Sequence, residues 1–213
     1  AGHGSVVLAL MPLSTAVAAA LVGGERPGLA FWAFCALGAL VVLVFTLSRA
    51  GWQVAPGDIF LLAAAASAGL GYAYSGVLSR TRPGWTVTAW ALTLSLPATS
   101  VVAFVSRPAV MPEAPSVWLS FAYLGIVSMF LGFVFWNAAL ARGGIARVGQ
   151  IQLLQPFATI AIAALVTAED LDPVEIVFAA AVVVIVAVAQ RLRVSRTDTG
   201  PAVIPPAPSP SQT

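Results

Sequence analysis

The sequence predicts an all-α integral membrane protein with about seven transmembrane helices. Of its 213 residues, 60% are hydrophobic and only 8% are charged, and the mean hydropathy is +0.96. A soluble domain has roughly 25% charged residues. A membrane helix takes about 20 apolar residues, so the chain has room for about seven spans and for no large water-soluble domain. This composition excludes a cytosolic enzyme, and the lack of a polybasic tract argues against nucleic-acid binding.

Seven apolar stretches, separated by Gly, Pro and Arg residues, are the predicted helices. In chain order they cover 5–22, 29–47, 59–78, 85–105, 117–140, 148–167 and 173–189. Each is too long and continuous for a barrel strand, which would have about ten residues of alternating polarity. The first is interpreted as a span and not as a signal peptide, because no basic segment precedes it. Residues 194–213 are rich in proline and predict a disordered tail.

The basic residues predict the orientation of these spans. All ten are arginines, and counting loops on alternate sides places eight on one side and two on the other. Positive charge marks the cytoplasmic side of a membrane protein. We therefore expect a cytoplasmic C-terminus, with Glu25 inside and Glu169 outside.

The first two and the last two spans are similar when residue numbers are shifted by 144. This shift aligns Pro12 with Pro156, Thr15 with Thr159 and Glu25 with Glu169. Ala- and Leu-rich spans can align by chance, but proline and glutamate at equal spacing favour a duplication. The aligned spans lie five apart, an odd number, so the copies would have opposite orientations. Inverted repeats of this kind are typical of transporters.

Three segments carry a family resemblance: Met11-Pro12-Leu13, Gly24-Glu25-Arg26, and 136–157, which reads WNAALARGGIARVGQIQLLQPF. The chain resembles, from about residue 4 to 191, the EamA-type transporters of the drug/metabolite transporter superfamily. That family has ten helices in two inverted five-helix repeats, and it exports or exchanges amino acids, related metabolites and drugs across bacterial inner membranes.

The resemblance implies a division of this chain into three parts. Residues 1–50 would be the last two helices of the first repeat, 51–193 the complete second repeat, and 194–213 a cytoplasmic tail. Two features depart from the family pattern. The family's first three helices would have to precede residue 1, and the second turn reads Ala168-Glu169-Asp170 where Gly-Glu is usual.

The sixth predicted span carries the most informative polar residues. Gln152, Gln155 and Thr159 are spaced by three and four residues, so they share one helical face. An amide buried in hydrocarbon costs several kcal/mol without a partner. We expect this face either to line a wet cavity or to bond neighbouring helices. Gln150 points elsewhere and is a weaker candidate.

Other residues complete the predicted substrate pathway and its supports. Trp136 is typical of an interface anchor, whereas Asn137 could bond another helix or reach a cytoplasmic vestibule. The third span offers tyrosine hydroxyls among glycines suited to close helix contact. The predicted pathway contains Gln152, Gln155, Thr159, Thr15, Tyr72, Tyr74, Asn137 and Trp136, with Pro12 and Pro156 as hinges, and Glu25 and Glu169 as structural helix-end carboxylates.

These residues favour a transporter that works by alternating access, with a cavity walled by the first, third, fifth and sixth spans. No carboxylate, lysine or histidine lies in the middle of a span, so a buried proton relay is not predicted. Uncharged walls suit small zwitterionic or amphipathic substrates. We predict no cofactor and no metal, and as partners membrane lipid, a small-molecule substrate, and a second copy or a missing N-terminal segment. The alternatives are a non-transporting remnant, a half-transporter that needs a partner chain, and an intramembrane enzyme, for which the sequence offers no dyad.

Overall fold

The computed structural model describes residues 2–50, 57–106, 114–167 and 172–196. Helices dominate this part of the chain. The elements are α1 (Gly2–Leu21), β1 (Glu25–Pro27), α2 (Leu29–Ala50), α3 (Asp58–Leu78), α4 (Gly84–Val105), α5 (Pro115–Ala122), the π-helix η1 (Tyr123–Leu131), α6 (Gly132–Gly143), α7 (Ile145–Gln150), the 3-10 helix η2 (Ile151–Leu154), α8 (Gln155–Thr167), α9 (Pro173–Arg191) and β2 (Val194–Arg196).

Six helices among the described residues are long and apolar enough to cross a membrane, and α1 contains a shorter apolar helix over Leu10–Leu21. Two of the six are composite. The segments α5, η1 and α6 form one span, Pro115–Gly143, and α7, η2 and α8 form another, Ile145–Val166. The predicted all-α membrane class is confirmed.

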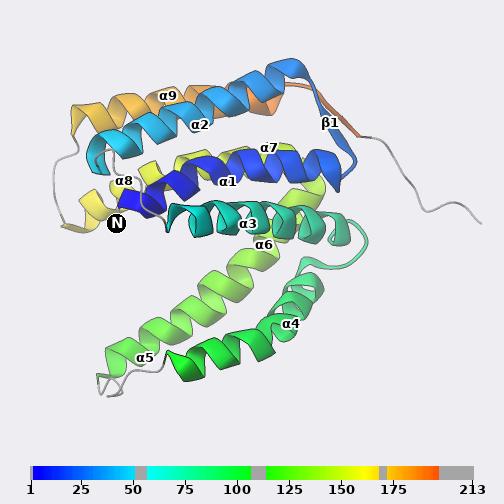
Figure 1. Ribbon diagram of the computed structural model, residues 1–213, viewed down its shortest axis with the longest axis vertical. Coiled ribbons are helices and arrows are strands. Elements are labelled where there is room, and N and C mark those ends of the chain that lie inside the picture. Colours follow the sequence, from blue (N-terminus) through cyan, green and yellow to red (C-terminus); the bar gives the residue numbers. More distant parts are fainter. Residues whose placement is uncertain (1, 51–56, 107–113, 168–171, 197–213) are drawn as a thin grey trace, which may run out of the picture.

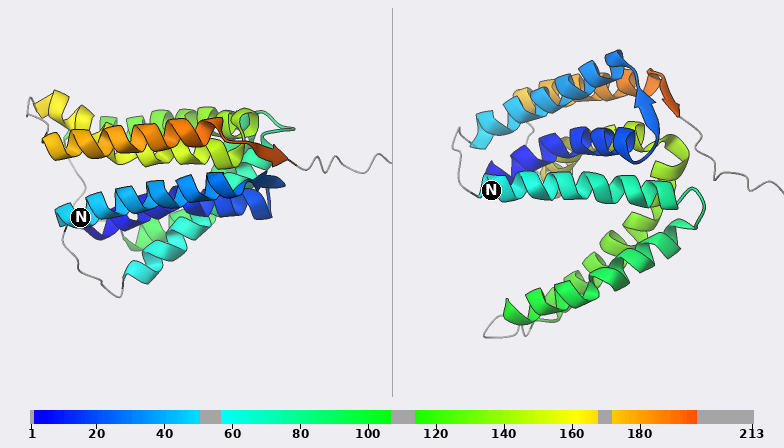
Figure 2. Two further views of the ribbon diagram at one scale, coloured as in Figure 1. Left: turned by 90° about the horizontal axis from the view of Figure 1, so that it is seen from above. Right: turned by 45° about the vertical axis from the view of Figure 1, so that its right-hand side comes forward.

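The helices form a bundle with a projecting arm. In the bundle α1 packs against α2, α3 and α7, and α2 packs against α9. The arm consists of α4 and the α5–η1–α6 span, which diverge from the bundle (Figures 1 and 2). Its side chains are largely uncovered, and Leu94 and Phe135, for example, are 81% and 73% exposed.

Two clusters of buried apolar side chains hold the bundle together. The first joins α1, α2, α6 and the start of α7 around Phe31, Leu140 and Ile145, which are fully buried. The second joins α2, η2, α8 and α9, where the Phe45 and Phe157 rings lie 5.1 Å apart. Each cluster connects α1 or α2 to elements about a hundred residues or more later in the chain.

The helix bounds follow the repeat predicted from the sequence. A shift of 144 residues places Leu29, where α2 begins, on Pro173, where α9 begins. It likewise places α1 on the α7–η2–α8 span. In Figure 1, α1 runs from the N-terminus toward β1, whereas α7 and α8 run in the opposite direction. Each helix of the first pair packs against its counterpart.

The predicted tail begins too early. Val194–Arg196 is not disordered but forms strand β2, which pairs antiparallel with β1, in register Glu25↔Arg196. The Ser195 hydroxyl also donates to the Arg26 carbonyl at 3.2 Å. The prolines of the predicted tail, which disfavour strand pairing, begin only at residue 201. Residues 194–196 contain no proline and can therefore pair as a strand.

The loop predicted at 141–147 is reduced to one residue. Helix α6 ends at Gly143 and α7 begins at Ile145. Gly144 lies between them with φ +88°, a conformation that glycine adopts without a Cβ penalty. This single turn brings the start of α7 beside β1.

Candidate functional site

A group of polar and aromatic side chains meets around Tyr72 in α3. The Tyr72 ring lies 5.7 Å from the Trp136 ring and 6.2 Å from the Phe133 ring, both on α6. The Tyr72 side chain is also within hydrogen-bonding reach of the Gln152 side chain on η2. Three elements distant in sequence therefore converge on one phenol.

A cavity of about 390 Å³ opens beside this group. Its walls come from α3, α4, η1 and α6. The third and fifth predicted spans therefore contribute, but α4 lines the cavity in place of the first and sixth spans. The difference arises because α4 packs against α6 and not only against its neighbour α3. The polar and aromatic lining residues are Tyr72, Ser75, Thr88, Ser95, Phe133 and Asn137.

Three polar atoms in the group around Tyr72 are buried without a hydrogen-bond partner among the described residues, and one of them belongs to Asn137, which lines the cavity. These atoms are Trp136 Nε1, Asn137 Oδ1 and Gln152 Oε1. Leaving such a group unpaired costs about 1–3 kcal/mol. The cluster therefore holds one unused donor and two unused acceptors.

Asn137 is held in place by its other amide atom. Its Nδ2 donates to Thr88 Oγ1 at 3.1 Å, and Thr88 Oγ1 donates to the Gly84 carbonyl at 2.9 Å. Asn137 is 2% exposed. Its Oδ1 therefore has a fixed position, because the rotation of the amide is set by α4. Thr88 was not singled out from the sequence, where a lone threonine in an apolar span carries no signal.

The structure separates the predicted pathway residues into two groups. Tyr72, Trp136, Asn137 and Gln152 come together, and Trp136 faces inward where an interface anchor was expected. The other four lie elsewhere. Tyr74 is 56% exposed and points away from the cavity, Gln155 and Thr159 are exposed, and Thr15 is fully buried between helices.

Thr15 and Gln150 belong to the contact between α1 and α7. A Cβ on Gly149 would lie 2.7 Å from Thr15 Cγ2, so the two helices touch at this point. Gln150, which is 1% exposed, donates from Nε2 to the Pro12 carbonyl at 3.1 Å. Of the two neighbouring amides, Gln150 thus bonds a helix, while Gln152 keeps an unused oxygen.

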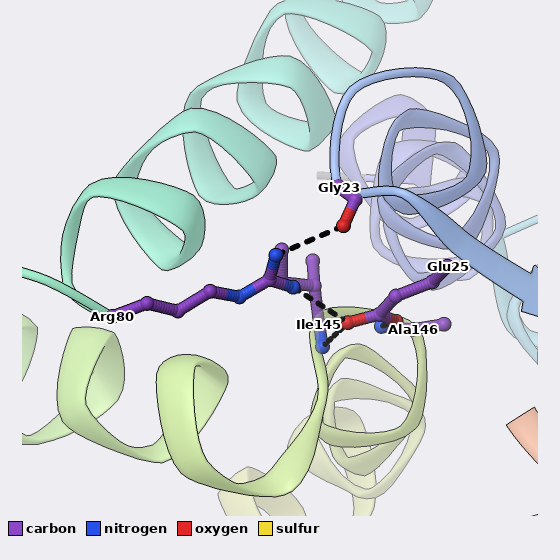
Figure 3. Close-up of polar contacts among 5 residues, drawn as sticks. All are labelled: Gly23, Glu25, Arg80, Ile145 and Ala146. Atoms are coloured by element: carbon purple, nitrogen blue, oxygen red, sulfur yellow. Dashed lines mark hydrogen bonds and ion pairs between the residues drawn. The ribbon is translucent and has the colours of Figure 1, made fainter. Parts of the chain in front are cut away.

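Glu25 forms the polar contact at the arginine-rich end of the bundle (Figure 3). Its carboxylate is 2% exposed and accepts hydrogen bonds from the backbone N–H groups of Ile145 and Ala146, each at 2.8 Å. Backbone N–H groups at the start of a helix lack acceptors within the helix. The two carboxylate oxygens of Glu25 are the acceptors for these groups at the start of α7. The sequence predicted a helix-end carboxylate here. Its counterpart Glu169 lies outside the described residues.

Arg80, at the end of α3, completes this contact. Its guanidinium donates to the Gly23 carbonyl at 2.9 Å and to Glu25 Oε1 at 3.1 Å. The side chain is 18% exposed, so the charge of Glu25 is balanced in a mostly dry environment. The sequence placed Arg80 on the arginine-rich side but gave no sign of its partner, because 55 residues separate the two.

Long apolar helices, a short polar turn at one end and a cavity between the helices define a multi-pass membrane protein. Within the described residues, no group of three or more His, Cys, Asp or Glu side chains could hold a metal ion.

Comparison with known proteins shows which kind of membrane protein this is. Residues 55–190 match the EamA-like transporter family. The chain belongs to this family of membrane transporters, as the sequence predicted.

Two similar proteins extend the comparison over most of the chain. The uncharacterized transporter YdeK of Bacillus subtilis (strain 168) is 43% identical over 191 residues, which are 89% of this chain and 66% of that protein. The chain therefore spans just under two thirds of that relative's length. A crystal structure with 23% identity shares the fold, with a TM-score of 0.70 over 89% of this chain and 68% of the other.

Proposed function

We propose that this chain carries the substrate cavity of a transporter for small zwitterionic solutes such as amino acids. The observation that carries the proposal is the cluster of unpaired polar atoms on Trp136, Asn137 and Gln152 around Tyr72. Of this cluster, Tyr72 and Asn137 line a cavity large enough for a small metabolite.

The chemistry of the cluster favours a solute with both donors and acceptors. An ammonium group can donate to the amide oxygens of Asn137 and Gln152, and a carboxylate can accept from Trp136 Nε1. None of the described residues that line the cavity is charged, so a net charge on the solute would remain uncompensated by them. A zwitterion pairs its own charges and meets this condition.

The proposed mechanism is alternating access by the two inverted copies, in the direction of export or exchange. Support comes from the antiparallel course of α1 and the α7–α8 span and from the packing of each helix on its counterpart. Movement of one copy against the other would open the cavity to each side in turn.

The test compares two amides in the same span. Gln152→Leu removes the unused oxygen, and Gln150→Leu removes a buried bond to α1. In proteoliposomes of the intact protein, uptake of radiolabelled L-serine, L-valine and L-methionine should fall at least tenfold in Gln152→Leu at unchanged membrane abundance. Gln150→Leu should instead lower abundance. Equal loss of abundance in both variants would show that Gln152 only bonds helices.

We further propose that additional helices cover the arm. In the most apolar part of the Pro115–Gly143 span no residue is buried, and such a surface suits helix packing as well as lipid. The candidates are a preceding segment of three helices, as in the ten-helix family pattern, or a second chain. The intact mass of the protein from its native membrane separates them. An excess of about 10 kDa over 21.8 kDa supports the preceding segment, and a mass near 21.8 kDa indicates a partner chain or a non-transporting remnant.

The proposed location is the bacterial inner membrane, with the arginine-rich end in the cytoplasm. Arg80, Arg142 and Arg147 all lie at the end that carries β1 and β2. Alkaline phosphatase fused after residue 213 should be inactive and a fluorescent protein there should be bright. The opposite result would invert the topology.

A further inference from the structure

A second pocket lies at the arginine-rich end, apart from the cavity around Tyr72. Its volume is about 370 Å³, and polar atoms make up most of its lining. Three parts of the chain form it. Its principal lining residues are Glu25 from β1, Arg142 and Gly144 from the α6–α7 turn, Arg147 from α7, and Val194 and Arg196 from β2.

The charges around this pocket do not cancel. Among the described residues, three guanidinium groups line it, on Arg142, Arg147 and Arg196, against one carboxylate. That carboxylate, on Glu25, already accepts from two backbone N–H groups and from Arg80. The remaining field is positive and attracts an anion.

The three arginines differ in how firmly they are held. Arg147 is half-buried, and its Nη2 donates to the Leu192 carbonyl at 2.7 Å. Its own carbonyl accepts from Gln190 Nε2 at 2.7 Å. Arg142 and Arg196 are exposed. The Arg147 guanidinium thus has a fixed position beside two exposed ones, which suits a multidentate oxyanion because the planar fork of arginine matches phosphate oxygens.

The walls of the pocket depend on contacts between the two copies of the repeat. Glu25 holds the α6–α7 turn, and the pairing of β1 with β2 places Arg196 opposite Glu25. Separation of these elements would pull the arginines apart. A ligand that needs all three would therefore stabilise the joined arrangement, because it binds that state more tightly.

We propose that this pocket binds a phosphate-bearing anion, and that the bound anion stabilises the joined arrangement of β1, the α6–α7 turn and β2. The anion is a soluble phosphate compound or the headgroup of an anionic lipid. This site is independent of the substrate cavity, so its test does not involve transport.

The experiment measures thermal unfolding of the intact protein in neutral detergent. The probes are inorganic phosphate against chloride at equal ionic strength, and phosphatidylglycerol against phosphatidylcholine. The pocket variant is Arg142→Gln with Arg196→Gln. The matched control is Arg82→Gln with Arg193→Gln, which removes the same charge from two exposed arginines outside the pocket lining.

We expect a probe to raise the unfolding temperature of the wild type and the control by several degrees and to leave the pocket variant unchanged. Each lost guanidinium should weaken binding about tenfold. A shift with phosphate alone identifies a soluble anion, and a shift only with phosphatidylglycerol identifies a lipid headgroup. Arg142→Lys, which keeps the charge but loses the fork, should weaken binding without abolishing it.

Two results would overturn the proposal. One is an equal shift in the pocket variant and the control, which would mean that the probes act through general charge. The other is a wild type whose unfolding temperature neither probe raises. Native mass spectrometry of the three proteins provides a second readout if the pocket variant is less stable before any probe is added.

Discussion

Replacing Glu25 by alanine should destabilise the protein more than any other change of a single charged residue described above. The carboxylate accepts two buried backbone hydrogen bonds at 2.8 Å and lies 3.1 Å from Arg80. A hydrogen bond to a charged group contributes about 1.5–3 kcal/mol. Glu25→Ala leaves two donors unpaired in a site that is 2% exposed, so we expect a loss of about 3–5 kcal/mol.

The loss of stability expected for Glu25→Ala can be divided between the backbone hydrogen bonds and the ion pair with Arg80. Glu25→Gln keeps one acceptor oxygen but faces the other backbone N–H with an NH₂ group, and it should cost about 2 kcal/mol. Arg80→Gln keeps both backbone bonds. It should cost about 1 kcal/mol, because the backbone N–H groups of Ile145 and Ala146 continue to stabilise the carboxylate.

An SDS-unfolding titration of the purified protein measures these differences as free energies of unfolding. Arg26→Ala is the control, because Arg26 is adjacent to Glu25 but exposed. The expected order of loss is Glu25→Ala, Glu25→Gln, Arg80→Gln and then Arg26→Ala. If Glu25→Ala were as stable as Arg26→Ala, the carboxylate would not cap α7, and the account of this end of the bundle would be refuted.

Two further predictions use the same titration. Gly149→Ala should lower the free energy of unfolding by about 1–3 kcal/mol, because its Cβ would lie 2.7 Å from Thr15 Cγ2. Gly71→Ala should be neutral or stabilising, because a Cβ there has no neighbour within 4 Å among the described residues. Equal effects of the two changes would contradict close packing of α1 on α7. Thr88→Val should lower the free energy of unfolding by about 1–2 kcal/mol, because it removes the hydroxyl that bonds Asn137. Thr88→Ser keeps the hydroxyl and should cost much less. If the valine variant were as stable as the wild type, this hydrogen bond would be absent.

The positions of the spans could be predicted because hydropathy depends on composition along one helix. The prediction for 29–47 differs from α2 by three residues at one end, and that for 173–189 differs from α9 by two. The larger difference, near residues 141–147, arises from Gly144, which turns the chain in one residue. The sequence shows a Gly-Gly pair but does not show that its second glycine has φ +88°.

The candidate site was predictable in residue type but not in arrangement. Asn137 and Gln152 stood out as amides in apolar spans, yet the Thr88 partner of Asn137 is 49 residues distant. Gln152 and Gln155 share a helical face, but only Gln152 lies within the packed part of the bundle. The side of α8 that carries Gln155 is uncovered, whereas Phe157, further along the same helix, is 7% exposed. The packing of neighbouring helices, which the sequence does not show, therefore separates two residues that periodicity groups together.

The two prolines that the predicted repeat aligns, Pro12 and Pro156, lie in helices of different regularity. Pro156 has no N–H to donate to the Gln152 carbonyl. Gln155 N–H bonds that carbonyl instead, and the preceding turn is the 3-10 helix η2. Pro12 occupies the equivalent position in α1, which continues through it as an α-helix.

The difference between the copies lies in their neighbours. Gln150 on α7 donates a hydrogen bond to the Pro12 carbonyl of α1. The regular helix α1 is therefore held at its proline by the span that is itself irregular near Pro156. If alternating access exchanges the conformations of the two copies, the irregular turn must move from Pro156 to Pro12. The Gln150–Pro12 hydrogen bond is then a contact that this exchange has to break, and its strength contributes to the stability of the state described here.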